Sequence, residues 1–230
     1  MLDIHTHILP EIDDGSSSVE QSIEMISMLV EQGVDKIVFT PHFYAEMEAP
    51  EQFLERRHEA YQKLLPYLKE QFPDIRFRLG TEICYYIGVS VMEDKKRLCI
   101  EGTPLFLLEL PMCKWERSVI TEVKELVRSE QVIVTLAHID RYFDFNPLSV
   151  FEELARMGVL MQLNADFALE KRHRRFIKKL AKKGLLHFIG TDAHNTGARC
   201  PRYEDAMRNL WPLRDYVFGN LSFYEEQFFN

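Results

Sequence analysis

Short apolar segments alternate with longer amphipathic segments along most of the chain. The apolar segments have the length and near-continuous hydrophobicity of buried parallel strands. The segments between them repeat apolar residues at helical spacing, as from Val19 through Ile23 and Ile26 to Val30. After an opening strand that contains His5 and His7, strands are predicted at residues 36–40, 75–82, 105–111, 132–138, 159–164 and 186–192, and helices at 19–33, 51–72, 115–130, 148–157, 169–183 and 203–213.

This alternation runs without a linker, repeat or low-complexity stretch, so it predicts one α/β domain over residues 1–230. Seven strands suit a distorted (β/α)7 barrel with parallel strands and helices outside, and an open doubly wound sheet is the alternative.

Local signals refine this prediction. Ser17 to Glu20 has the spacing of a capping box, Gly158 and Gly184 suit helix ends, and Pro66 should kink or split its helix. Residues 84–103 are expected to be irregular, with a short extended stretch at 98–100. The aromatic tail after residue 213 is assigned no helix.

Charge and composition exclude several classes of protein. Lys and Arg number 28 against 36 Asp and Glu, and the net charge of −8 argues against non-specific binding to nucleic acid or anionic membranes. There is no apolar run of about 18 residues and no signal-peptide pattern, so we expect a cytoplasmic protein without membrane insertion. The composition indicates no oligomeric state.

The four cysteines form no C-x-x-C pair, which argues against a zinc ribbon or a thioredoxin-like site. A cysteine phosphatase loop requires an arginine six positions after the cysteine. The residues at those positions are Ser90, Leu105, Val119 and Ala206, so that loop is absent.

Histidines and carboxylates stand at or just after the ends of six of the seven predicted strands. Barrel enzymes place their chemistry at this end of the strands. A carboxylate there can simply cap the next helix, but capping does not explain the whole series. A mixture of imidazoles and carboxylates without thiolates suits zinc, manganese or iron, and so many ligands suit two or three ions. The candidate ligands are His5, His7, Asp14, His42, Glu82, Glu109, His138, Asp192 and His194, while His58, His173 and His187 are assigned to structure.

Several short motifs resemble the PHP (polymerase and histidinol phosphatase) superfamily. Within it they are most similar to the bacterial protein-tyrosine phosphatases of capsule and exopolysaccharide operons. The motifs run in order across nearly the whole chain: His5-Thr6-His7, Asp13-Asp14-Gly15, Thr40-Pro41-His42, Gly80 with Glu82, Leu108-Glu109, Leu136-Ala137-His138 with Arg141-Tyr142, and Thr191-Asp192-Ala193-His194-Asn195.

The resemblance implies a single PHP-type domain with three divalent ions, commonly manganese, with iron or zinc as alternatives. It assigns one ion to His5, His7, Glu82 and Asp192, a second to Glu82, Glu109 and His138, and a third to Asp14, His42 and His194. Arg141 and Arg199 match the family's two phosphate-binding arginines, although surface ion pairs are the plain alternative. The implied reaction is in-line attack on phosphorus by a metal-activated water, and the proton donor is open, with Asp140 and Asp166 as candidates.

The chain departs from the family pattern at Ile139-Asp140, where many members have Pro-Glu, and at residues 165–168. Both departures concern substrate selection more than metal binding. Aromatic residues that follow ligand positions either wall a phosphotyrosine pocket or simply pack at the barrel mouth. These residues are Phe43, Tyr44, Tyr85, Tyr86, Tyr142 and Phe143. The basic segment 171–183 suits a solvated helix face, with docking to an acidic partner as the alternative.

Four functions compete. The favoured one is a metal-dependent protein-tyrosine phosphatase acting on a phosphotyrosine protein, which the resemblance implies is a bacterial tyrosine kinase of polysaccharide export. The second is a PHP-type small-molecule phosphatase for histidinol phosphate or a sugar phosphate. A non-catalytic metal-binding regulator would not need the complete ligand set, and a nuclease is disfavoured by the net charge.

Overall fold

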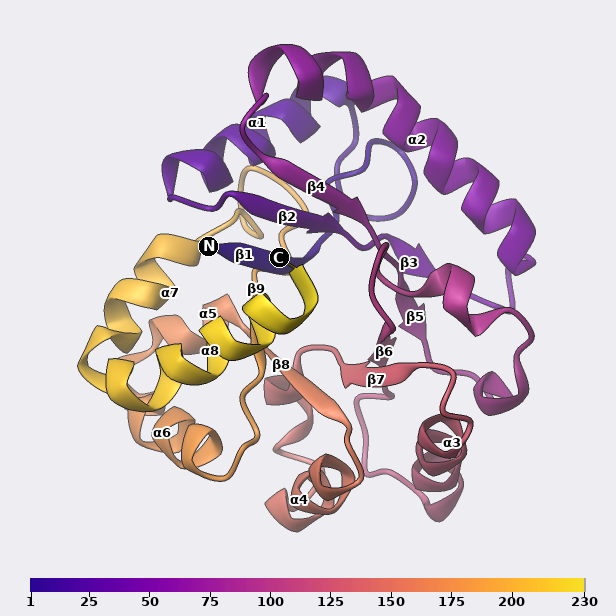
Figure 1. The fold of residues 1–230 in the computed structure, drawn as a ribbon, viewed down its shortest axis with the longest axis vertical. Helices are drawn as coiled ribbons and strands as arrows, with labels where there is room; N and C mark the ends of the chain where they lie inside the picture. Colours follow the sequence, from indigo (N-terminus) through magenta and orange to yellow (C-terminus); the bar gives the residue numbers. More distant parts are fainter. Residues whose placement is uncertain (230) are drawn as a thin grey trace.

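The computed structural model describes residues 1–229, so the end of the predicted domain at Asn230 lies outside the described residues. Strands and helices alternate along the chain, with strands in the centre and helices around them (Figure 1). The strands are β1 Leu2–Thr6, β2 Lys36–Phe39, β3 His42–Phe43, β4 Arg76–Leu79, β5 Glu82–Cys84, β6 Leu105–Glu109, β7 Ile133–Leu136, β8 Leu160–Asn164 and β9 Phe188–Gly190. The α-helices are α1 Val19–Glu31, α2 Pro50–Gln71, α3 Arg117–Arg128, α4 Leu148–Arg156, α5 Ala165–Leu169, α6 Arg174–Lys182, α7 Tyr203–Leu210 and α8 Arg214–Phe229.

The strands are all paired in parallel, in the orders β1-β2-β4 and β3-β5-β6-β7-β8-β9. β3 and β5 continue the paired strands β2 and β4 after a break of two residues in each, so the nine strands form seven segments. The last segment returns to the first, because Thr6 and Ala193 form a parallel bridge and the Asp192 N–H donates to the His5 carbonyl at 2.8 Å. This arrangement confirms the predicted distorted barrel.

The breaks are the main difference from the predicted strands. The third strand was expected to run from 75 to 82, but it stops at Leu79 and resumes at Glu82. A side chain at Gly80 would bring its Cβ to 3.0 Å from Ile100 and 3.1 Å from Thr40, so the two broken strands approach closely at this point. The break lets His42 and Glu82 start new short strands that pair with each other.

Two hydrophobic clusters fill the molecule. The larger lies between the strands and the surrounding helices. The smaller contains Leu2, Leu105, Leu160 and Phe188, which are the first residues of their strands, together with Phe229 at the end of α8. Helix α8 therefore closes the N-terminal end of the barrel, and both chain ends lie there (Figure 1).

Helix α8 corrects the prediction of an aromatic tail without a helix. Its apolar residues are spread around the helix with almost no one-sided pattern, so helical periodicity does not reveal it. The side chains of Arg76 and Arg78 donate to the carbonyl oxygens of Phe229 at 3.4 Å and Phe228 at 2.9 Å, and Lys36 pairs with Glu225. These contacts tie the last turn of the helix to the first strands.

Four smaller expectations also need correction. Helix α2 is continuous through Pro66. Proline has no N–H to donate to the backbone carbonyl one turn earlier, and because Pro66 is exposed that carbonyl can bind water instead. The expected extended stretch at 98–100 is extended at Cys99, but Leu98 ends the 3-10 turn Lys95–Leu98 instead. The cap of α1 is Ser18, which accepts from the Gln21 N–H at 3.2 Å, one position later than the predicted box. The expected helix 169–183 divides into the end of α5, a 3-10 turn and α6.

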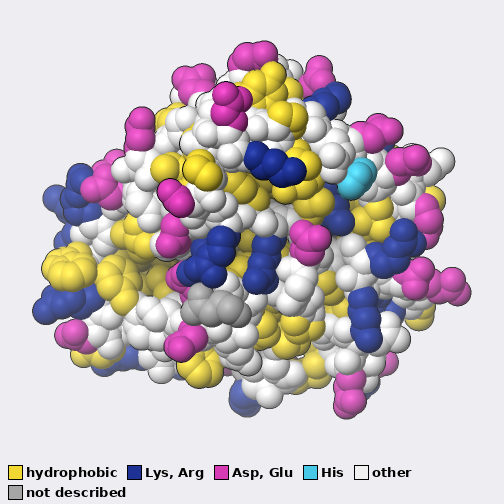
Figure 2. All heavy atoms as spheres, turned by 45° about the horizontal axis from the view of Figure 1, so that its top comes forward, with side chains coloured by type: hydrophobic (Ala, Val, Ile, Leu, Met, Phe, Trp, Pro, Cys, Tyr) yellow, Lys and Arg dark blue, Asp and Glu magenta, His cyan; other side chains and the backbone are white. Residues whose placement is uncertain are grey.

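Among residues 1–229, no helix combines the length and the apolar character needed to cross a bilayer. On the face shown in Figure 2, acidic and basic side chains are interspersed, with hydrophobic atoms exposed between them.

Phe229 should contribute to stability by closing the barrel. It is 2% exposed, whereas Phe223 on the same helix is 59% exposed. We expect Phe229→Ala to lower the free energy of unfolding by about 2–4 kcal/mol, because a large buried side chain is lost. Phe223→Ala should change it by less than about 1 kcal/mol. Urea denaturation of both variants tests this, and equal effects would contradict the role given to Phe229.

His187 should make stability sensitive to acid. Burial lowers its pKa to about 4, and its Nδ1 accepts from the Met161 N–H at 2.9 Å. The unfolded chain, with an ordinary histidine pKa of about 6.5, binds this proton first as the pH falls, so stability decreases between about pH 6.5 and pH 4. At pH 5 the loss from this residue is about 2 kcal/mol. His187→Asn, which keeps an acceptor, should show a correspondingly smaller difference in urea unfolding between pH 7.5 and pH 5; an unchanged difference would exclude His187 as its source.

Candidate metal centre

All nine predicted ligand side chains lie at the C-terminal end of the barrel. His5 and His7 come from β1 and the residues after it, and His42 and Glu82 begin the short strands β3 and β5. The others end or follow later strands, except Asp14, which lies on the loop after β1. Six are buried, His42 and Glu109 are partly buried, and Asp14 is exposed. The six buried residues are His5, His7, Glu82, His138, Asp192 and His194.

The Glu82 carboxylate is the centre of this cluster. Its Oε2 atom lies 3.1 Å from Nε2 of His5, 3.1 Å from Nε2 of His7 and 3.1 Å from Nδ1 of His42. It nevertheless has no hydrogen-bond partner of acceptable geometry, although it is fully buried. A buried carboxylate oxygen without a donor, surrounded by imidazole nitrogens, is what a bound cation would satisfy, so these residues fit a divalent metal.

The imidazoles are oriented toward the same point. In His5, His7 and His194 the Nδ1 atom donates to an oxygen of the protein, namely that of Gln162 at 3.1 Å, Asp13 at 2.7 Å and the Asp192 carbonyl at 2.8 Å. Each Nε2 then carries the lone pair and faces the cluster. Metal-binding histidines are commonly held in this way.

The ligand atoms fall into four adjoining groups whose members lie within 4.8 Å of one another. Three contain the sets expected from the resemblance, with His7 added to the third. The fourth, which includes Cys84, was not predicted because a single cysteine matches no metal-binding spacing. The groups are His5, His7, Glu82 and Asp192; Glu82, Glu109 and His138; His7, Asp14, His42 and His194; and His42, Cys84 and Glu109.

The carboxylates of the cluster favour positive charge on His7 and His138, whereas burial lowers the pKa of His42 and lowers that of His194 to about 4. Burial alone would raise the pKa of Glu82, but the surrounding imidazoles hold it well below its usual range. Burial alone would lower the pKa of His138, but hydrogen bonds to Glu109 and Glu82 raise it to about 9. Burial raises the pKa of the Cys84 thiol above its usual value, and the protonated Sγ donates to Glu109 Oε2 at 2.9 Å. Protons therefore occupy positions that a divalent ion would compete for.

Two of the candidate ligands have strained backbones. His138 has φ of 32° and Asp192 has φ of 52°, in the left-handed region that non-glycine residues rarely adopt. Such conformations persist only where the surrounding structure imposes them, and they concentrate at functional sites. Here they turn both side chains into the barrel mouth.

Asp13 and Gln162 support the cluster, and sequence reasoning gave neither a role. Asp13 accepts from His7 Nδ1 and from the His42 N–H at 3.0 Å, so it holds two candidate ligands. Gln162 Oε1 accepts from His5 Nδ1 and from the His138 N–H at 2.6 Å. Asp13 precedes Asp14 in a motif that was recognised, but Gln162 lies inside a strand with no local signal.

The two arginines lie at the mouth and pair with the same carboxylate. Arg141 Nη2 and Arg199 Nη2 both contact Asp192 Oδ2, the latter at 3.0 Å. Arg199 Nη1 is also 3.7 Å from Asp14 Oδ2. The side chains are 29% and 39% exposed, so both guanidinium groups remain accessible from solvent.

The aromatic residues near the mouth divide into two sets. Phe43 and Tyr142 are fully buried in the core, so they do not wall a pocket. Tyr85, Tyr86 and Phe143 pack partly against the same core. Tyr44 is 40% exposed, and its ring centroid lies 5.3 Å from that of His42. Of the six, it is therefore the residue best placed to meet a substrate ring.

The candidate proton donors are engaged elsewhere. Asp140 is half-buried and accepts from the Asn164 N–H at 2.9 Å, while Asp166 pairs with Arg202 at 3.1 Å.

The basic segment 171–183 packs against the last helix. Lys178 and Lys182 of α6 lie over the Tyr216 ring of α8, with Nζ at 4.1 and 5.0 Å from the ring centroid. These contacts favour the solvated helix face over docking to an acidic partner.

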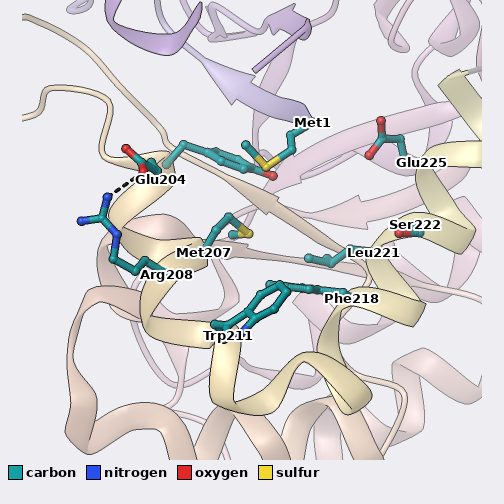
Figure 3. Close-up of a pocket in the computed structure, with 10 residues that line it drawn as sticks. Met1, Glu204, Met207, Arg208, Trp211, Phe218, Leu221, Ser222 and Glu225 are labelled. Atoms are coloured by element: carbon teal, nitrogen blue, oxygen red, sulfur yellow. Dashed lines mark hydrogen bonds and ion pairs between the residues drawn. The ribbon is translucent and has the colours of Figure 1, made fainter. Parts of the chain in front are cut away.

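A separate apolar pocket of about 530 Å³ lies between α7 and α8 (Figure 3). Met1 and Tyr203 line it, and the Tyr203 hydroxyl donates to the Leu2 carbonyl at 2.7 Å. The pocket therefore lies at the N-terminal end of the barrel, away from the candidate ligands.

Parallel strands that end in adjoining histidine and carboxylate groups define a PHP-type metal-dependent phosphoesterase fold. The chain belongs to the CpsB/CapC family of capsular polysaccharide synthesis, whose profile matches residues 1–212.

Curated relatives are similar over nearly the full length. Tyrosine-protein phosphatase CpsB of Streptococcus agalactiae serotype III (strain NEM316) is 28% identical over 235 residues, covering 94% of this chain and 91% of that protein. Tyrosine-protein phosphatase YwqE of Bacillus subtilis (strain 168) is 29% identical over 215 residues, covering 90% and 82%.

Solved structures agree. One belongs to a set of crystal structures of YwqE from Bacillus subtilis and CpsB from Streptococcus pneumoniae, which are described as metal-dependent tyrosine phosphatases. It matches with a TM-score of 0.80 at 27% identity, and the match covers 97% of this chain and 90% of that chain. The histidinol phosphate phosphatase of Lactococcus lactis matches with a TM-score of 0.59 at 14% identity, covering 95% and 93%, which shows a shared fold alone.

Asp13 should tune metal affinity through His7 and His42. We expect Asp13→Ala to weaken binding of Mn²⁺ about 10- to 100-fold, because both ligands lose an orienting partner. Calorimetric titration of metal-stripped protein measures this. Asp166→Ala, which removes an exposed carboxylate paired with Arg202, is the matched control and should bind normally. Equal affinities of the two variants would exclude a role for Asp13.

Proposed function

We propose that this protein is a metal-dependent protein-tyrosine phosphatase that hydrolyses phosphotyrosine in a polypeptide. The observation that carries the proposal is the Oε2 atom of the buried Glu82 carboxylate, which faces three imidazole nitrogens at 3.1 Å without accepting a well-formed hydrogen bond. The names of the relatives and the match to metal-dependent tyrosine phosphatases support the same activity.

The proposed centre holds three divalent ions, with manganese first and iron or zinc as alternatives. Glu82 is shared between two of the proposed sites, as a bridging carboxylate would be. When bound, the ions supply a nucleophilic water at neutral pH and neutralise charge on the phosphoryl group. The proposed sets are His5, His7, Glu82 and Asp192; Glu82, Glu109 and His138; and Asp14, His42 and His194.

Arg141 and Arg199 are the proposed phosphate ligands. Each offers planar paired donors suited to phosphate oxygens, and their charge offsets the charge that develops in the transition state. Asp192 holds both guanidinium groups at the mouth. Tyr44 is proposed to pack against the substrate ring, from its exposed position beside His42.

The proposed substrate is a bacterial tyrosine kinase that controls polysaccharide export, and the proposed location is the cytoplasm. Membership of a capsular polysaccharide synthesis family supports the pathway, and the relatives' activity supports a phosphotyrosine protein as substrate. The proposal covers one domain over residues 1–230.

A small-molecule phosphatase is the second candidate, favoured by the fold shared with a histidinol phosphate phosphatase. The open mouth argues for the protein substrate. Asp14, Arg199 and Arg141 have side chains that are 62%, 39% and 29% exposed, so the centre is accessible to a large molecule.

Phosphotyrosine hydrolysis should require metal and His138. Metal-stripped protein should be inactive on a phosphotyrosine peptide, regain activity with Mn²⁺, and hydrolyse histidinol phosphate far more slowly. His138→Ala should lower peptide turnover at least about 100-fold, because one proposed site loses its only imidazole. His58→Ala, on an exposed face of α2, is the control and should leave turnover unchanged. Turnover of histidinol phosphate alone would favour the second candidate.

A further inference from the structure

Exposed apolar side chains gather on one half of the barrel mouth. Within residues 1–229, six of the eleven large hydrophobic residues that are exposed lie in the loops after β3, β5, β6 and β7. These four strands are consecutive neighbours in the sheet, so their loops lie side by side. The six are Tyr44 (40% exposed), Met47 (79%), Ile87 (87%), Val91 (79%), Met112 (59%) and Phe145 (44%).

The backbones of the loops after β5, β6 and β7 are anchored although the side chains are exposed. The Tyr85 N–H donates to the Glu109 carbonyl at 2.9 Å, which joins the β5 and β6 loops. The Trp115 N–H donates to Asn146 Oδ1 at 2.9 Å, which joins the β6 and β7 loops. The Ser90 N–H donates to Glu122 of α3 at 2.9 Å. The apolar side chains of these three loops are thus presented on a fixed surface.

This surface lies close to the proposed phosphate site along the chain. Met112 comes three residues after Glu109, Phe145 four residues after Arg141, and Ile87 five residues after Glu82. At about 3.3–3.6 Å per residue, each lies within about 10–18 Å of a residue of the centre. An extended peptide of five or six residues, held by its phosphate at the centre, covers that distance.

The other half of the mouth is polar. The exposed side chains in the loops after β1, β8 and β9 include Glu11, Asp14, Asp166, Glu170 and Arg202. The loops after β3, β6 and β7 expose charged side chains too, among them Glu46, Lys114 and Asp144. A substrate chain therefore meets large apolar side chains among charged ones on that side of the phosphate site and, within the described part of the chain, no large exposed apolar side chain on the other. A metabolite too small to leave the centre would use neither.

We propose that the loops after β3, β5, β6 and β7 form a docking surface for apolar side chains that flank the phosphotyrosine in a polypeptide substrate. Exposed apolar patches beside a functional site mark interaction surfaces, and burial of such side chains adds binding energy. This inference rests on the proposed phosphatase function and names the kind of sequence that the site selects.

The test compares two phosphotyrosine peptides, one with leucine and phenylalanine on both sides and one with serine and glycine. The wild-type protein with Mn²⁺ should show about tenfold higher kcat/KM for the apolar peptide. Met112→Ser combined with Phe145→Ser should abolish this preference. Trp211→Ser combined with Phe223→Ser, which changes two residues that are each 59% exposed and lie on the last two helical segments, should preserve it. Hydrolysis of p-nitrophenyl phosphate should be equal in all three proteins.

Two results would overturn the docking surface: equal kcat/KM for both peptides in the wild type, or an unchanged preference in the Met112 and Phe145 variant. The same peptides with a non-hydrolysable phosphonate in place of the phosphate give the preference as a ratio of affinities, by fluorescence anisotropy. If the proposed phosphatase function failed, no phosphate ester would be hydrolysed, while a ratio of affinities near one would separately reject the docking surface.

Discussion

The need to neutralise a buried carboxylate governs the C-terminal end of this barrel. Glu82 is completely buried, and an isolated charge in such a place is very costly. Three imidazole nitrogens at 3.1 Å surround one of its oxygens, yet none donates a well-formed hydrogen bond to it. Cations in the cluster, whether protons or metal ions, satisfy what the protein alone leaves open. The rest of the site is arranged around that requirement.

The distortion of the barrel follows from the same requirement. If β2 and β4 continued without a break, His42 and Glu82 would be interior positions of long strands. The breaks before them start β3 and β5, which pair His42 directly with Glu82. At the other end of the barrel, α8 and Phe229 close a purely apolar cluster. Stability and chemistry are therefore separated along the barrel axis, as they are in barrel enzymes generally.

Sequence reasoning proposed the candidate ligands because most of them stand where an apolar strand ends or breaks, and strand ends meet at one edge of a parallel sheet. It missed features that depend on three-dimensional contacts. Gln162 lies inside the strand β8, and its role depends on His5 and His138 from other strands. Helix α8 has no one-sided apolar pattern, and it is held by contacts with the first strands rather than by its own periodicity. Cys84 joins His42 and Glu109 only because the barrel brings three strands together.

The fold shared with a histidinol phosphate phosphatase means that the barrel by itself does not select a substrate. The difference must lie in what surrounds the centre. Here the loops after β3, β5, β6 and β7 expose apolar side chains, and the backbones of the last three are tied to one another or to α3. A surface of this kind costs solubility unless something covers it, and a metabolite confined to the centre would cover none of it. In the proposed function, a polypeptide that carries its phosphotyrosine into the centre covers this surface at each encounter, so the loops and not the ligands determine which phosphate esters are hydrolysed.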